Sequence, residues 1–123
     1  MTFRYARHTS NLIALEKFYT EIVGLKKLGG FENHSSYDGI FLGNPEENWH
    51  LEFTSSDENP VHQFDEDDAL VFYLENEMEF TQIKERISEH KITLEKAKNP
   101  YWQENGLQVS DPDGYKVIFS LKK

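Results

Sequence analysis

A duplicated hairpin constrains this chain more than any other feature of its sequence. Residues 106–119 read GLQVSDPDGYKVIF, and residues 39–53 contain a looser copy, GIFLGNPEENWHLEF. Gly39 and Gly106 are 67 residues apart, as are Pro45 and Pro112, whereas the matches beyond the turn are 66 residues apart. The chain therefore contains one hairpin twice, with a loop one residue longer in the first copy. Because 123 residues are few for two independent cores, we expect a single domain.

The segments around the two hairpins predict the same order of elements twice. In the first half we expect a strand, a helix capped within residues 9–11 and ended by Gly24, and then three strands. These first-half strands are predicted at residues 3–8, 25–31, 37–43 and 49–55. The second half repeats the order, with Asn76 and Glu79 spaced like a capping box at the start of its helix. Its strands are predicted at residues 69–75, 92–98, 106–110 and 115–121.

The sequence thus predicts an α+β protein made of two βαβββ modules. We place module 1 at residues 1–56, a polar and acidic linker at 57–67, and module 2 at 68–123. Neighbouring residues of a strand point to opposite faces, so His50 and Glu52 should lie on the face away from the helix, together with Arg4. The offset between the hairpins sets Ile118 at the position equivalent to Glu52.

Charge and composition exclude several classes of protein. The formal net charge of −9 repels phosphate backbones, so we expect no binding to nucleic acid. The longest apolar runs are far shorter than the ~20 residues of a membrane-spanning helix, so we expect no membrane insertion. The chain has no cysteine, which excludes a disulfide scaffold, and its charged N-terminus is unlike a signal peptide. We therefore expect a cytoplasmic protein.

Several segments resemble the vicinal oxygen chelate superfamily, which includes glyoxalase I, extradiol dioxygenases, fosfomycin-resistance enzymes and bleomycin-binding proteins. The segment TSNLIALEKFYTEIVGL is similar to the first helix of that superfamily, and DPDGYKVIF to its last hairpin. Together with HLEFTSS and LVFYLEN, they look most like a bacterial subgroup labelled glyoxalase or bleomycin-resistance-like. The resemblance implies an open eight-stranded mixed barrel, the glyoxalase/bleomycin resistance fold, and a homodimer.

The resemblance also implies four metal-ligand positions, one on the first and one on the last strand of each module. Here they are occupied by Arg4, Glu52, Ala69 and Ile118. Glu52 can bind a metal, but an arginine cannot be deprotonated, and Ala69 and Ile118 offer no lone pair. We therefore predict no metal and no other cofactor at this site, with one divalent metal bound through Glu52 and His50 as the alternative.

Glu52 is the candidate catalytic residue, and two interpretations of it remain open. It can act as a general base, or it can form an ion pair with Arg4, which would occupy the volume of a metal. His50 and His8 have Glu52 between them on one predicted face, which leaves a relocated zinc site as a further hypothesis. Ser55 and Ser56 have no predicted histidine and acid around them, so a hydrolytic nucleophile is not supported.

Two aromatic residues complete the predicted ligand-binding set of Arg4, His50, Tyr73, Trp102 and Ile118. Trp102, beside Tyr101, could stack on a planar ligand or close the end of the barrel. Tyr73 lies on the same side of its predicted strand as Ala69 and should therefore point to the predicted site, although core packing is an alternative. The SDPDG segment has the composition of a tight turn, and we assign it no chemistry.

We predict a small-molecule-binding protein with a degenerate, metal-free site, one version of which sequesters or resists a toxic compound. The alternative is a metal-dependent lyase, isomerase or dioxygenase of the glyoxalase type with a non-standard metal site. A third interpretation is a regulatory module that binds a partner protein.

Overall fold

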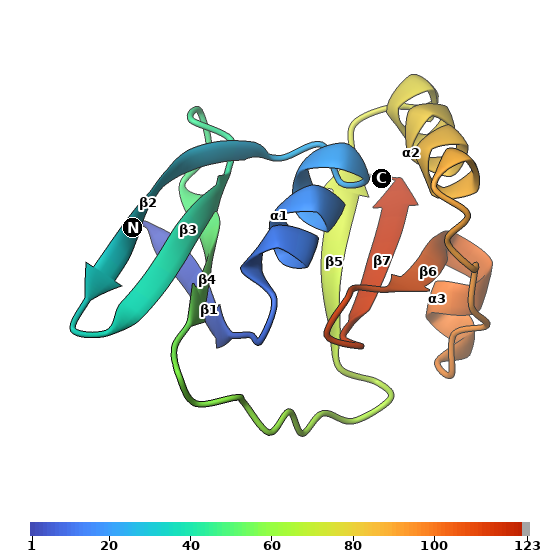
Figure 1. The fold of residues 1–123 in the computed structure, drawn as a ribbon. Helices are drawn as coiled ribbons and strands as arrows, with labels where there is room; N and C mark the ends of the chain where they lie inside the picture. Colours follow the sequence, from blue (N-terminus) through green and yellow to red (C-terminus); the bar gives the residue numbers. More distant parts are fainter. Residues whose placement is uncertain (122–123) are drawn as a thin grey trace. The chain divides into compact units, whose positions relative to one another are not determined.

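The computed structural model describes residues 1–121 of the chain. These residues form two compact units, the first spanning Met1–His62 and the second beginning at Gln63. Each unit contains one mixed sheet, and the prediction of an α+β protein is confirmed (Figure 1). No helix of the described residues is long and apolar enough to cross a membrane.

The first unit is a four-stranded sheet with one helix on it. Its elements are β1 (Phe3–His8), α1 (Leu12–Glu21), β2 (Lys26–His34), β3 (Tyr37–Gly43) and β4 (Trp49–Ser55). The sheet order is β1-β4-β3-β2, in which β1 and β4 are parallel and the other pairs are antiparallel. All four predicted strands are confirmed, and β2 runs three residues beyond its predicted end.

The helix α1 begins where the sequence predicts and ends at Glu21, three residues before Gly24. The Asn11 side chain caps it by accepting a hydrogen bond from the backbone N–H of Ala14, at 3.0 Å. Gly24 has a φ of 90°, the left-handed conformation that glycine adopts readily after a helix. The helix buries Leu15, Phe18 and Tyr19, and the Tyr19 ring stacks on Phe53 of β4 at 5.1 Å between centroids. One face of the first sheet is therefore buried against α1 in the core.

The second unit is a three-stranded sheet that repeats the topology of the first. Its elements are β5 (Ala69–Leu74), α2 (Glu77–Glu89), α3 (Pro100–Asn105), β6 (Gly106–Ser110) and β7 (Lys116–Leu121), in the sheet order β5-β7-β6. The β5 and β7 strands are parallel, as are β1 and β4, and the β6–β7 hairpin matches β3–β4. The duplicated hairpin thus occupies equivalent places in the two sheets.

The predicted capping box of α2 is confirmed with one difference. The Asn76 side chain accepts from the N–H of Glu79 at 2.9 Å, as predicted. The Glu79 carboxylate accepts from the N–H of Glu75, one residue before the cap. Ile83 and Ile87 are the buried residues of this helix, which packs against β5 and β7.

The predicted strand at residues 92–98 is wrong, and a helix that was not predicted follows it. In this segment, Glu95 alone pairs with β6, through a single bridge to Gln108. The following residues form α3, which Asn99 caps and Pro100 begins. The described residues therefore form seven strands, and the open eight-stranded barrel stays a prediction.

Candidate functional site

The face of the first sheet opposite α1 holds the predicted site residues of module 1. We call it the helix-free face and define it by Arg4 on β1, Phe31 on β2, Phe41 on β3, and His50 and Glu52 on β4. The register sets Arg4 opposite His50, and Phe41 opposite Glu52. Because alternate residues of a strand share a face, these five side chains lie on one side of the sheet.

The Arg4 guanidinium connects these residues. Its Nε donates a hydrogen bond to His50 Nε2 at 2.8 Å, and Nη1 lies 3.5 Å from Glu52 Oε1. Its Cζ lies over the Phe41 ring, 4.9 Å from the centroid. The predicted ion pair between Arg4 and Glu52 is therefore confirmed. Since a guanidinium only donates, His50 must accept through Nε2 in this arrangement.

The Arg4 guanidinium keeps hydrogen-bonding capacity in spite of these contacts. A guanidinium carries five N–H groups, and the contacts with His50 and Glu52 engage two of them. The Arg4 side chain is 48% exposed, whereas that of Glu52 is 14% exposed. The cation is thus oriented by its neighbours while its remaining donors can meet an acidic group.

Aromatic rings extend the site from Arg4 towards the sheet edge. Phe31 and Phe41 lie 5.9 Å apart between centroids, and His50 lies 5.9 Å from Phe41. The Phe31 ring covers Gly39, where an added Cβ would come within 2.4 Å of it. The helix-free face therefore combines one cation, one carboxylate and an aromatic surface.

His8 lies at the end of β1 in a separate cluster of polar contacts. Its Nδ1 is 2.8 Å from Thr54 Oγ1, and its Nε2 is 3.0 Å from both Ser56 Oγ and the Glu58 carbonyl oxygen. Because a carbonyl only accepts, Nε2 carries the proton, and it cannot then take one from Ser56. His62 Nε2 donates to the His8 carbonyl at 2.8 Å, so this cluster ties the linker to β1.

The proximity of His8 and Ser56 was not predicted, because Ser56 lies beyond the strand register that related the other residues. The relocated zinc hypothesis is not supported by the arrangement, since His8 pairs with Thr54, four residues along β4 from His50. Within residues 1–121 the structure places no group of three His, Cys, Asp or Glu side chains that could hold a metal.

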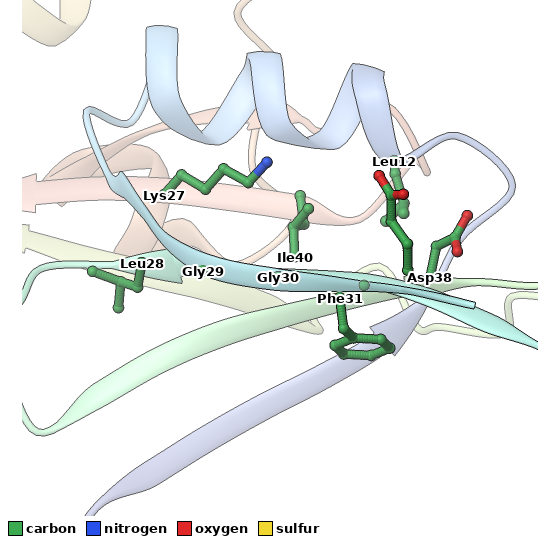
Figure 2. Close-up of a pocket in the computed structure, with 10 residues that line it drawn as sticks. Leu12, Lys27, Leu28, Gly29, Gly30, Phe31, Asp38 and Ile40 are labelled. Atoms are coloured by element: carbon green, nitrogen blue, oxygen red, sulfur yellow. The ribbon is translucent and has the colours of Figure 1, made fainter. Parts of the chain in front are cut away.

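A groove of about 650 Å³ runs along β2 (Figure 2). Its floor includes Gly29 and Gly30, and Lys27, Ile40 and Asp38 point to the side of α1, whereas Leu28 and Phe31 point to the other side. Lys27 pairs with Glu16 of α1 at 3.4 Å. The Asp38 carboxylate accepts from the N–H of Asn33. These charged groups of the groove thus already have partners in the fold.

The predicted residues of module 2 lie in different surroundings. Tyr73 is 56% exposed on β5, and its ring lies 6.4 Å from that of Trp102 on α3. Tyr101 packs edge-on against Trp102 at 4.9 Å. Ile118 is 2% exposed, and its Cγ2 would lie 2.9 Å from a Cβ added at Gly106. The ligand-binding roles of Tyr73, Trp102 and Ile118 stay predictions.

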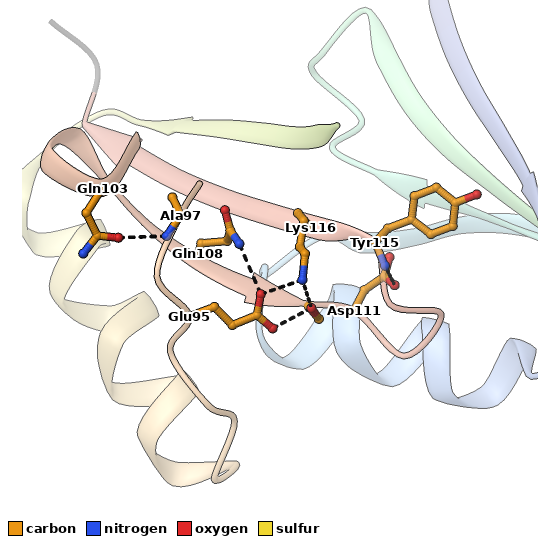
Figure 3. Close-up of polar contacts among 8 residues, drawn as sticks. Glu95, Ala97, Gln103, Gln108, Asp111, Tyr115 and Lys116 are labelled. Atoms are coloured by element: carbon orange, nitrogen blue, oxygen red, sulfur yellow. Dashed lines mark hydrogen bonds and ion pairs between the residues drawn. The ribbon is translucent and has the colours of Figure 1, made fainter. Parts of the chain in front are cut away.

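A polar network in module 2 was not predicted (Figure 3). Glu95 accepts from Lys116 Nζ at 2.9 Å, from Ser110 Oγ at 2.6 Å and from Gln108 Nε2 at 3.2 Å. Burial tends to raise the pKa of Glu95, but the hydrogen bonds from Ser110, Lys116 and Gln108 and the charge of Lys116 lower it overall. The network holds residues 92–98 against β6 where a full strand was expected.

Comparison with known families supports the resemblance along most of the chain. Residues 3–54 match the family model of the YycE-like N-terminal domain, and residues 67–120 match that of the YycE-like C-terminal domain. The uncharacterized protein YycE of Bacillus subtilis (strain 168) is 35% identical over 121 residues, which cover 98% of this chain and 87% of YycE.

Solved structures show the same fold. A crystal structure of the Bacillus subtilis YycE protein, of unknown function and described as a candidate glyoxalase/fosfomycin resistance protein, matches with a TM-score of 0.87 at 35% identity, covering 99% of this chain and 90% of that one. Glyoxalase I of Leishmania major matches with a TM-score of 0.75 at 21% identity, covering 98% and 86%. TnmS3, an antibiotic binding protein from Streptomyces sp. CB03234, matches with a TM-score of 0.72 at 16% identity, covering 100% and 96%.

Proposed function

Because the chain belongs to the YycE-like family within the vicinal oxygen chelate superfamily, we propose that it binds a small molecule through an acidic group, without a resident metal. The observation that carries the proposal is Arg4, a partly exposed cation held on the helix-free face by His50 and Glu52. The resemblance to the superfamily implies that Arg4 occupies a position that holds a metal ligand in metal-dependent members.

The residues at the four expected ligand positions do not fit a divalent metal. Arg4 has no lone pair to donate, and Ala69 and Ile118 have no donor atom at all. The Glu52 carboxylate, which could bind a metal, lies 3.5 Å from the Arg4 guanidinium. A metal bound there would have to displace or repel a fixed positive charge. The remaining N–H groups of Arg4 can instead donate to an acidic group of a ligand.

The aromatic surface beside Arg4 supports a ligand that is partly apolar. Phe31 and Phe41 are half-buried and therefore keep exposed ring area. Ligand sites commonly combine such apolar area with a few placed polar groups. We include Tyr73, Trp102 and Ile118 of module 2 in the proposed ligand-binding set. An open barrel in which residues 92–98 take the place of the eighth strand belongs to the same proposal, and small-angle scattering on the whole chain would test it.

Sequestration of a toxic compound is the version of this function that we favour. TnmS3 is an antibiotic binding protein, and YycE is described as a candidate glyoxalase/fosfomycin resistance protein. Binding alone would suffice for such a role, so Glu52 need not act as a base. The alternative is a metal-dependent lyase, isomerase or dioxygenase in which Glu52 and His50 hold a divalent metal.

Metal analysis and ligand titration of the purified protein separate these functions. We expect less than stoichiometric metal, no loss of melting temperature on chelation, and saturable binding of small aromatic acids. The R4Q variant should bind them about 10- to 100-fold more weakly, because a charge-assisted hydrogen bond is lost. K27Q removes an exposed cation that points to the other side of β2, and it is the matched control. A stoichiometric metal whose removal lowers the melting temperature would support the alternative instead.

A further inference from the structure

The packing of Phe31 suggests which ligands the helix-free face can take. The Phe31 Cζ would lie 2.4 Å, and its Cε1 2.5 Å, from a Cβ added at Gly39. The ring therefore lies across the glycine backbone, where any larger residue would lift it. Gly39 is buried, whereas Phe31 is half-buried. The half-buried Phe31 ring keeps exposed area, beside the His34 ring, which lies 6.0 Å from it at an interplanar angle of 75°.

The Arg4 side chain reaches towards this surface. It starts on β1, contacts His50 and Glu52 on β4, and its Cζ lies over Phe41 on β3. In the sheet order, the next strand is β2, which carries Phe31. The guanidinium therefore lies over β3, one strand away from Phe31, and the Phe41 and Phe31 rings are neighbours 5.9 Å apart.

We propose that the ligand is a planar aromatic acid whose acidic group meets Arg4 and whose ring stacks on Phe31. The inference rests on the proposed function and narrows its ligand class. The acid complements the cation, and a carboxylate can lie in the plane of the guanidinium. A flat ring can stack on Phe31 with offset faces, whereas a puckered aliphatic ring of equal carbon number cannot.

Two probes with the same carbon skeleton and charge test this preference. 2-Naphthoate is flat, and trans-decahydro-2-naphthoate is puckered and more hydrophobic, so a preference for the first cannot come from hydrophobicity. Both are titrated by NMR into the isotope-labelled whole chain, which reports the affinity and the amides that respond. We expect the wild type to bind 2-naphthoate about three- to tenfold more tightly.

Glycine variants assign the preference to Phe31. In G39A the new methyl group displaces the Phe31 ring, so the affinity ratio should fall to about one. G29A is the matched control, because its Cβ would lie 3.7 Å from Phe41, an ordinary contact. It should keep the ratio. F31L removes the ring without adding volume at Gly39, and it should also lose the preference.

The outcomes distinguish this inference from the proposed function. If the wild type binds both acids equally and R4Q weakens both, the inference is wrong and the proposed function stands. The inference is also wrong if G39A and F31L keep the wild-type ratio. If neither acid binds, or R4Q binds both as well as the wild type, the proposed function fails and the inference fails with it.

Discussion

The Glu95 network should make module 2 sensitive to acid. Glu95 accepts hydrogen bonds from three side chains, and its contact with Lys116 is an ion pair of 2.9 Å. The two side chains are 27% and 23% exposed, so solvent screens the pair in part. Substituting Glu95 by Gln removes the charge and one acceptor oxygen and keeps the size of the side chain. The perturbation therefore tests the charge rather than the packing.

The expected loss of stability follows from these contacts. Hydrogen bonds to a charged group contribute roughly 1.5–3 kcal/mol each, and surface ion pairs contribute about 0–1 kcal/mol. For a partly exposed network we expect E95Q to lower the free energy of unfolding by about 1–2 kcal/mol at pH 7. Because the pKa of Glu95 is lowered in the folded state, its contribution is fully present above the ordinary value of 4.5. It is lost as the pH falls through the folded-state pKa.

Urea unfolding of wild type and E95Q at several pH values measures this effect. The difference between the two proteins should be largest near neutral pH and should shrink steadily below 4.5, the ordinary pKa of a glutamic acid. E104Q, which changes an exposed carboxylate of α3, is the matched control and should be nearly neutral throughout. A difference between wild type and E95Q that is absent at pH 7, or that persists unchanged in acid, would refute the role of the network.

Further predictions concern the linker, the second helix, the aromatic pair and the assembly. H8A should lose about 1–2 kcal/mol of stability and speed proteolysis within residues 56–62, whereas H90A, at the end of α2, should leave that proteolysis unchanged. N76A should lose about 1 kcal/mol in urea unfolding, because α2 loses its cap. Y73L should leave the melting temperature unchanged but lower the affinity for aromatic acids measured by titration. An unchanged affinity would remove Tyr73 from the proposed ligand-binding residues. Light scattering should give the mass of a homodimer, and a monomeric mass would contradict that prediction.

The duplication explains why much of the fold could be predicted. The offset of 66 residues between the hairpins places Glu52 and Ile118 at equivalent positions, and the structure pairs Ala6 with Glu52 and Val71 with Ile118 in the same way. Strand parity then sufficed to gather Arg4, His50 and Glu52 on one face. Such inferences succeed because strand geometry has a strict period of two.

The predictions from the sequence failed where side-chain contacts, and not a regular pattern of backbone hydrogen bonds, hold the chain in place. Residues 92–98 alternate like a strand, but one backbone bridge and the side chain of Glu95 hold them to β6. The period of two cannot distinguish a full strand from an extended segment held by one bridge and a side chain, because both place alternate residues on one face. The α3 helix could have been recognised, since an asparagine before a proline is a common helix start and is present at Asn99. The contact of His8 with Ser56 depends on a linker that no periodic pattern describes.

The two modules carry their cation on different members of the same pair of strand positions: Arg4 is on the first strand of module 1, and Lys116 is on the last strand of module 2. His50 and Lys116 are opposite Arg4 and Ala69 in the same register. Lys116 donates hydrogen bonds to Glu95 and Ser110 with two of its three N–H groups, and the Glu95 carboxylate neutralises its charge. Arg4 is also paired with a carboxylate, but at the longer distance of 3.5 Å and with most of its donors unused. Equal topology therefore leads to a structural ion pair in module 2 and to a partly exposed cation in module 1, which is why we propose charge recognition on the first sheet.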